Sequence, residues 1–96
     1  MLILITYDVR TTTKEGRRRL RRVARACQNF GQRVQLSVFE CNVGEREWAL
    51  LRSQLLGTFH ADEDSLRFYY LPEDAVRRAE HHGVRASLNF EGPLIA

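Results

Sequence analysis

The first residues of the chain form a nearly continuous apolar run. Residues 2–9, LILITYDV, are rich in β-branched side chains and are apolar at both odd and even positions before Asp8. A half-exposed strand alternates apolar and polar residues, whereas a strand buried on both faces does not. The run therefore predicts a central strand of a sheet that ends near Asp8.

A helical period replaces this pattern after residue 12 and continues to about residue 28. Apolar residues recur at i, i+3, i+4 and i+7, at Leu20, Val23, Ala24 and Cys27. Arginines repeat this spacing on the opposite side, and we call them the arginine face: Arg18, Arg21, Arg22 and Arg25. Thr12 and Glu15 have the spacing of a capping box at the helix start, and Gly31 is expected to end the helix.

The segment RVQLSVFECNV, residues 33–43, predicts extended structure with a break. Its apolar residues change parity near Ser37. One extra residue in a strand sends every later side chain to the other face, so the change indicates a bulge or a tight join between two short strands. A second helix is expected to begin at Gly44 and to end at Gly57, with a core-facing side made of Trp48, Leu51 and Leu55.

The last third of the chain predicts a strand over 65–71, a short helix over 73–82 and an extra strand within 84–96. Up to residue 71 the order is strand, helix, two short strands or one bulged strand, helix, strand. This βαββαβ order is that of the ferredoxin-like α+β fold. We therefore predict a single domain over residues 1–96, with an antiparallel sheet and both helices on one of its faces.

This arrangement leaves the second face of the sheet uncovered, although the first strand is apolar on both sides. A domain of 96 residues buries a limited share of its surface, which makes self-association a reasonable expectation. Two copies that meet sheet to sheet would bury the second face. The sequence therefore predicts a homodimer.

The charges of the chain are unevenly distributed. Nine basic residues and one acidic residue lie between Arg10 and Arg33, whereas the remaining residues include six bases and eleven acids. A concentrated positive field attracts polyanions, above all nucleic acid. No membrane partner is expected, because the other side of the arginine-rich helix has mainly small apolar residues rather than Trp or Phe, and no apolar stretch is long enough to span a bilayer. Two cysteines without metal-ligand spacing indicate reduced thiols and a cytoplasmic protein.

Four motifs in order resemble one known family. ITYDV at the end of the first strand, the arginine-rich helix, GQRVQLSVFEC and LRFYYL are similar to the small CRISPR-associated protein of the adaptation stage, commonly described as an endoribonuclease. The resemblance spans nearly the whole chain. It implies a ferredoxin-like homodimer whose C-terminal strand crosses to the partner's sheet.

The resemblance also implies an activity, partners and site residues. Members of this family bridge two copies of the spacer integrase, and several cleave single-stranded RNA or double-stranded DNA in the presence of Mg²⁺. The metal-binding acid of the family corresponds to Asp8 in the Tyr7-Asp8 pair. The resemblance further assigns functional positions to Arg17 and Arg19, and to Arg33 and Phe39.

The residues themselves leave two readings of Asp8 open. The carboxylate could cap the following loop or pair with Arg10, which is the ordinary role of a loop acid. Alternatively, two Asp8 side chains related by a two-fold axis could share one magnesium ion, because one carboxylate is a poor Mg²⁺ site. Tyr7 points to the opposite face and is interpreted first as a packing residue.

The basic residues are predicted to contact a nucleic-acid backbone. Natural solvated helix faces mix signs, because like charges four residues apart repel by a few tenths of a kcal/mol, and this face does not mix. The predicted nucleic-acid contacts are Arg10, Arg17, Arg18, Arg19, Arg21, Arg22, Arg25 and Arg33. Ser37 is expected to stabilise the bulge, and Phe39 is expected on the uncovered sheet face, where it would enter a dimer core or stack a base.

The predicted function is a homodimeric nucleic-acid-binding subunit of CRISPR spacer acquisition with magnesium-dependent endonuclease activity at paired Asp8. The main alternative is a non-catalytic bridge that holds integrase subunits and protospacer DNA. An RNA-recognition module of the same fold is disfavoured, because the chain lacks the glycine-aromatic signature of that sheet. A small-molecule sensor would leave the arginines unexplained.

Overall fold

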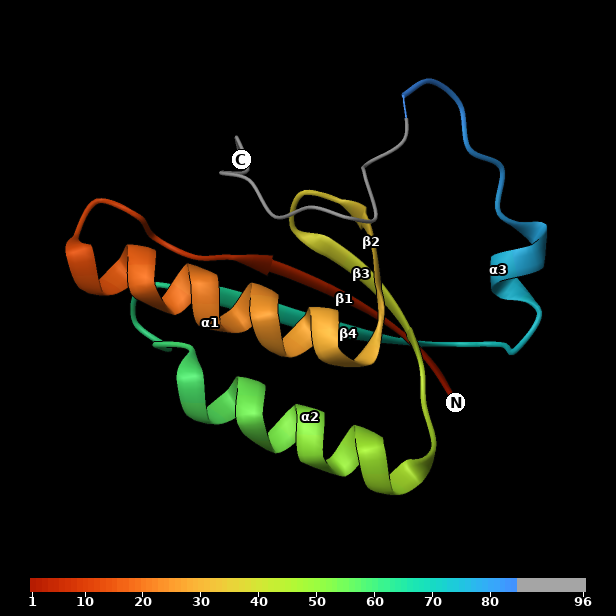
Figure 1. Ribbon diagram of the computed structural model, residues 1–96, viewed down its shortest axis with the longest axis horizontal. Coiled ribbons are helices and arrows are strands. Elements are labelled where there is room, and N and C mark those ends of the chain that lie inside the picture. Colours follow the sequence, from red (N-terminus) through yellow and green to blue (C-terminus); the bar gives the residue numbers. More distant parts are fainter. Residues whose placement is uncertain (85–96) are drawn as a thin grey trace.

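In the computed structural model, residues 1–84 are described, and they form two layers, a sheet and a pair of helices (Figure 1). The elements in chain order are β1 (Leu2–Asp8), α1 (Lys14–Phe30), β2 (Gln32–Gln35), β3 (Val38–Asn42), α2 (Glu45–Thr58), β4 (Ser65–Leu71) and α3 (Ala75–Arg78). No helix within residues 1–84 combines the length and the apolar content that crossing a membrane requires.

The four strands form one antiparallel sheet in the order β2-β3-β1-β4. Strand β1 is therefore central, as its apolar run predicts, and its Ile5 is paired with Phe39 of β3 and Phe68 of β4. This strand order with two crossing helices is the ferredoxin-like arrangement. The predicted α+β fold class is confirmed.

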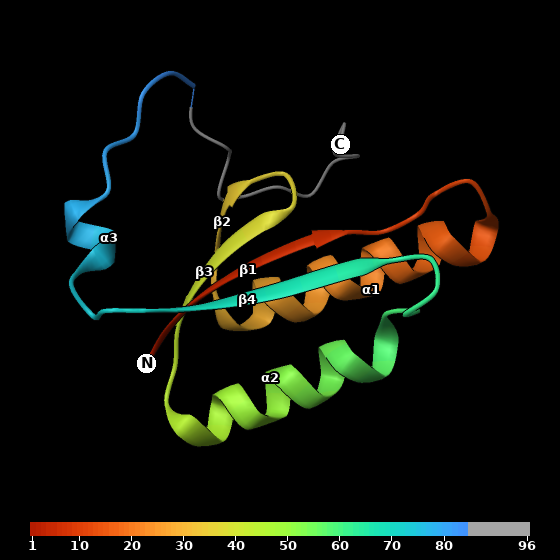
Figure 2. The ribbon, with the colours of Figure 1, turned by 180° about the vertical axis from the view of Figure 1, so that it is seen from behind.

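Helices α1 and α2 lie side by side on one face of the sheet, and Figure 2 shows the strands from the opposite side. Alternate residues of β1 point into the layer between sheet and helices, where Ile3, Ile5 and Tyr7 are buried. The predicted apolar positions of α2, Trp48, Leu51 and Leu55, are all buried. Of those predicted in α1, Val23 and Cys27 are buried, and Leu20 and Ala24 are partly buried against the core. Both cysteines are free and buried.

The start of α1 differs from the predicted capping box. Thr13, not Thr12, is the N-cap, and its hydroxyl accepts a hydrogen bond from the Gly16 N–H at 3.0 Å. Because the third helical position is Gly16, no glutamate side chain completes a box. The helix ends at Phe30, and Gly31 follows as its cap, as predicted.

The predicted break near Ser37 is a two-residue turn, Leu36 and Ser37, between β2 and β3. A separate irregularity shifts the β2–β3 register between Arg33 and Gln35. Helix α3 covers only four residues, so the helix predicted over 73–82 is mostly wrong. The extra strand predicted within 84–96 falls almost entirely outside the described residues.

The face of the sheet that α1 and α2 do not cover is called the open face. Strand alternation and the register assign it these side chains: Leu2, Leu4, Thr6, Asp8, Val38, Glu40, Asn42, Ser65, Arg67, Tyr69 and Leu71. The open face thus mixes apolar and polar residues around the central strand.

Candidate functional site

Asp8 is the last residue of β1 and is exposed. Its neighbour Tyr7 enters the core, so strand alternation directs the Asp8 carboxylate to the open face. Ser65, the first residue of β4, lies opposite it in the ladder. Within residues 1–84 the carboxylate makes no hydrogen bond and no ion pair, including none to Arg10. Its oxygens are therefore available to a ligand.

A single chain offers only part of a magnesium site at Asp8. Mg²⁺ takes about six oxygen ligands, usually one or two carboxylates with water and phosphate. In the described part of the chain, no three His, Cys, Asp or Glu side chains come together as possible metal ligands. An exposed carboxylate fits such an ion as one ligand, and the remaining oxygens must come from water, substrate or a second copy of the chain.

The arginine face lies along the exposed side of α1. All four of its residues are exposed, whereas the opposite side of the helix buries Val23, Ala26 and Cys27. Among residues 1–84, no carboxylate forms an ion pair with any of the four arginines. The helix therefore presents uncompensated positive charge at the spacing predicted from the sequence.

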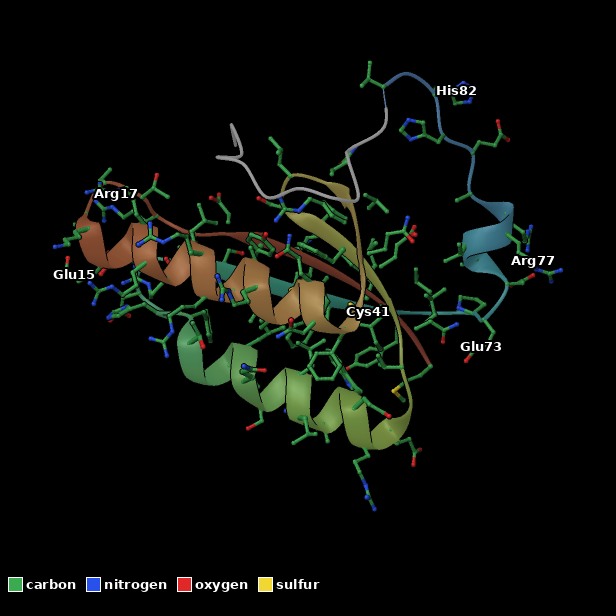
Figure 3. The ribbon with its side chains drawn as sticks, viewed as in Figure 1. Glu15, Arg17, Cys41, Glu73, Arg77 and His82 are labelled. Carbon is green, nitrogen blue, oxygen red and sulfur yellow. The ribbon has the colours of Figure 1, made fainter. Side chains whose placement is uncertain are left out.

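The arginine face and Asp8 lie on opposite sides of the sheet. Helix α1 covers the core side, whereas Asp8 points away from it, so one phosphodiester cannot contact both within a single chain. Arg17 is exposed near the start of α1 (Figure 3). Arg10 is exposed in the loop between β1 and α1. The Arg10 Nε donates to the Thr12 hydroxyl at 3.1 Å, and the Arg17 Nη1 donates to the Thr11 carbonyl at 3.2 Å.

Arg19 has a different environment from the other helix arginines. Its Nε donates to Asp64 Oδ2 at 2.8 Å, its Nη2 to Asp64 Oδ1 at 3.3 Å, and Glu63 lies 3.5 Å from Nη2. Only 14% of the Arg19 side chain is exposed, and Asp64 has 0% exposure. The predicted contact between Arg19 and nucleic acid therefore competes with a buried intramolecular ion pair.

Asp64 was not identified from the sequence, where HADED indicates a surface loop. Its carboxylate also accepts hydrogen bonds from the Arg10 N–H at 3.1 Å and the His60 N–H at 2.9 Å. Burial alone would raise the pKa of Asp64, but hydrogen bonds from Arg19 and from these two N–H groups outweigh it and lower the pKa. Partners 45 and 54 residues away give no local sequence signal.

The lowered pKa predicts a specific dependence of stability on pH. Because the folded-state pKa lies below the unfolded value of about 3.9, Asp64 stabilises the fold above that value. This contribution is lost as the pH falls through the folded-state pKa. Asp64→Asn should therefore reduce the free energy of unfolding by about 2 kcal/mol at neutral pH and by less under acidic conditions. Urea denaturation at several pH values measures this, and a pH-independent difference would contradict it.

Tyr7, Arg33 and Phe39 form a cluster on the core side of the sheet. The Tyr7 and Phe39 rings are stacked with centroids 6.2 Å apart, and the Arg33 Cζ lies 4.9 Å from the Phe39 centroid. Burial raises the pKa of Tyr7 to about 12, although the positive charge of Arg33 opposes the shift. Tyr7 is thus a packing residue, as its parity predicts.

The expected position of Phe39 on the uncovered face is wrong. Phe39 is paired with Ile5 and shares its inward direction, so its ring has 0% exposure and can neither stack a base nor meet a partner. Arg33 is paired with Phe39 and is 7% exposed, which separates it from the exposed arginines. Ser37 lies in the turn, where its carbonyl accepts the Tyr7 N–H at 3.1 Å.

Comparisons with known proteins agree with this geometry. The family model described as CRISPR associated protein Cas2 matches residues 1–79. The CRISPR-associated endoribonuclease Cas2 of Chlorobaculum tepidum is 56% identical over 95 residues, which cover 99% of each chain. The CRISPR-associated endonuclease Cas2 of Halalkalibacterium halodurans is 48% identical, again over 99% of each chain.

A solved structure supports the same assignment. The crystal structure of Streptococcus pyogenes Cas2 is similar with a TM-score of 0.77 and 47% sequence identity, over 86% of this chain and 100% of that chain. Sequence and fold therefore agree over most of the chain, and they agree with the resemblance of the four motifs. The chain belongs to the CRISPR-associated protein Cas2 family.

Proposed function

We propose that the chain is a homodimeric, nucleic-acid-binding subunit of CRISPR spacer acquisition with magnesium-dependent endonuclease activity on RNA or double-stranded DNA. The observation that carries this proposal is the position of Asp8. An exposed carboxylate with no partner among residues 1–84 ends a central strand, on the face of the sheet that the helices leave uncovered. The names endoribonuclease and endonuclease of the two relatives favour the same activity.

The proposed dimer joins two open faces. Leu4 and Val38 are only partly buried within one chain, and their burial against a second copy would supply the apolar contact. The two-fold axis would bring two Asp8 carboxylates near each other. Together they would hold one magnesium ion, with water and a phosphate oxygen as further ligands. Such an ion polarises a phosphodiester and lowers the pKa of bound water.

The arginine face has a separate role in this proposal. It holds the backbone of a duplex by phosphate contacts, which position the duplex but do not read its sequence. The spacer integrase is the proposed protein partner. Nucleic-acid binding and cleavage then occur on different surfaces of the dimer, because Asp8 and the arginine face lie on opposite sides of each sheet.

Light scattering and a cleavage assay test the proposal together. The protein in solution should have twice the mass of the 11.2 kDa chain. It should cleave single-stranded RNA or duplex DNA with Mg²⁺ but not with EDTA. If the protein were a monomer at micromolar concentration, the proposed magnesium site shared by two Asp8 carboxylates would be contradicted.

The second candidate function is a non-catalytic bridge that holds integrase subunits and protospacer DNA. The separation between Asp8 and the arginine face favours it, because a duplex bound to that face does not reach Asp8 of the same chain. In this case Asp8 would shape the dimer interface or a protein contact. A dimer that binds duplex DNA without cleaving any substrate would select the bridge.

Charge reversal on α1 tests the binding surface. We expect Arg18→Glu combined with Arg22→Glu to weaken duplex binding at least about tenfold, because phosphate contacts supply most of the nonspecific affinity. If each arginine neutralises one phosphate, the slope of log K for duplex binding against log salt concentration should become less steep by roughly 2. Fluorescence anisotropy at several salt concentrations measures both quantities.

A matched control changes the same charge on the neighbouring helix. Arg46→Glu with Arg52→Glu replaces two exposed bases of α2 and should have a much smaller effect on the salt slope. Equal slopes for the α1 variant and the wild type would place the duplex elsewhere.

A further inference from the structure

The Asp64 carboxylate connects three parts of the chain around the end of β1. It accepts hydrogen bonds from the backbone of the β1–α1 loop, from the α2–β4 loop and from the side chain of Arg19 in α1. The side chain is fully buried, so it cannot touch nucleic acid or a metal ion directly. A buried charge with four hydrogen-bond contacts is costly to assemble and therefore invites a functional explanation.

The connected segments flank Asp8 on both sides. Asp64 directly precedes Ser65, which lies opposite Asp8 in the ladder, and the Arg10 N–H that it binds is two residues after Asp8. The Asp8–Ser65 pair is the last of the β1–β4 ladder. Strand ends open more readily than strand centres, and the Asp64 bridge closes the ladder beyond this last pair.

The Asp8 carboxylate has no side-chain support of its own among residues 1–84. Its position therefore depends on the backbone at the end of β1. A shift of about 1 Å in a reacting group can lower a rate about a hundredfold. The bridge is thus placed where a small movement of Asp8 has a large consequence for catalysis, and the exposed arginine face takes no part in the bridge.

We infer that Asp64 is a positioning residue that fixes the end of β1 for cleavage at Asp8, and that Arg19 acts on Asp64 rather than on a phosphate. The inference rests on the proposed nuclease function. It assigns Arg19 a different role from the arginine face, although all these arginines belong to one helix.

The kinetic test compares Asp64→Asn and Arg19→Gln at a temperature where every variant is folded. Both should lower kcat for RNA cleavage at least about tenfold with little change in KM. Combining them should add little to either single change, because both break the same bridge. Leu51→Val, on the buried side of α2, controls for lost stability and should leave kcat unchanged.

Three kinetic outcomes would overturn the inference. Asp64→Asn could cleave as fast as Leu51→Val, which would make Asp64 purely structural. Arg19→Gln could raise KM and flatten the salt dependence while Asp64→Asn does not, which would return Arg19 to the phosphate-binding set. Fully additive losses in kcat would show that the two residues act separately.

Amide hydrogen exchange keeps the inference testable even if the wild type cleaves nothing. Asp64→Asn should accelerate exchange of the Arg10 amide and of β1–β4 amides near Asp8, but not of those near Ile3. Leu51→Val should not produce this local pattern. If Asp64→Asn accelerated amide exchange uniformly over the chain, the positioning role would be refuted. If the acceleration were confined to the end of β1 in a protein without nuclease activity, only the proposed function would be refuted.

Discussion

Replacing Asp8 with Asn is expected to reduce the proposed magnesium-dependent cleavage of RNA and duplex DNA at least about a hundredfold, because it would remove a ligand of the proposed metal ion and with it several kcal/mol of transition-state stabilisation. The fold should be unaffected. Asp8 is exposed and makes no hydrogen bond or ion pair within residues 1–84, so an amide of the same shape loses no contact there. The melting temperature should stay within about 2 °C of the wild type.

The proposed dimer gives this prediction a second readout. Two Asp8 carboxylates that approached across its two-fold axis would repel each other, and the amide would remove this repulsion. Asp8→Asn should therefore dimerise at least as tightly as the wild type when EDTA is present. Sedimentation at several protein concentrations measures the association. A weaker dimer would indicate that Asp8 makes a structural contact across the interface.

Glu40→Gln is the matched control for Asp8→Asn. Glu40 lies on the same face of the sheet, opposite Leu4 in the ladder, and the substitution makes the same chemical change. It should retain cleavage. Equal residual cleavage by Asp8→Asn and the wild type would point to a contaminating nuclease and would favour the bridge. Equal losses in Asp8→Asn and Glu40→Gln would indicate that the charge of the whole face matters rather than one ligand.

The regular elements of this fold follow from periodicity. The β1 segment is recognised as a buried strand by its short continuous apolar run of β-branched residues, and α1 is recognised by apolar residues at helical spacing. The sequence predicts the N-cap one residue too early because three consecutive threonines offer equivalent hydroxyls. The hydrogen bond to Gly16 distinguishes Thr13 only in the folded chain.

The direction of Phe39 could not be predicted in the same way. Apolar residues occupy both parities between 33 and 43, so either set can face the core, and the choice depends on register with β1. The pairing of Phe39 with Ile5 settles it. The burial of Arg33 follows from the same register, because Arg33 is opposite Phe39 in the hairpin.

Only the part of the candidate site that has a local sequence signal is predictable from the sequence. Asp8 and the arginine face produce local signals, namely an acid that ends an apolar run and charges at helical spacing. Asp64 produces none, since HADED contains three acids and nothing within the segment shows which of them is buried. Only the approach of α1 to the loop before β4 selects Asp64 and removes Arg19 from the exposed set.

Gly16→Ala is expected to destabilise the fold by about 3 kcal/mol, although alanine is the better helix former. A Cβ at this position would overlap the Arg10 carbonyl oxygen and would lie 3.1 Å from the Arg10 carbonyl carbon and 3.2 Å from the Thr13 hydroxyl. Two of these atoms belong to the backbone, so the β1–α1 loop must move. That movement would weaken the Thr13 cap and the bond between Arg10 N–H and Asp64.

Gly57→Ala separates this steric effect from helix propensity. Gly57 lies within α2, and a Cβ there would meet nothing within 4 Å. The same substitution should therefore stabilise the fold by about 0.5–1 kcal/mol. Urea denaturation of the two variants measures both signs. If Gly16→Ala were also stabilising, the β1–α1 loop would have to be mobile enough to make room for a methyl group, and the fixed geometry inferred for the end of β1 would fail with it.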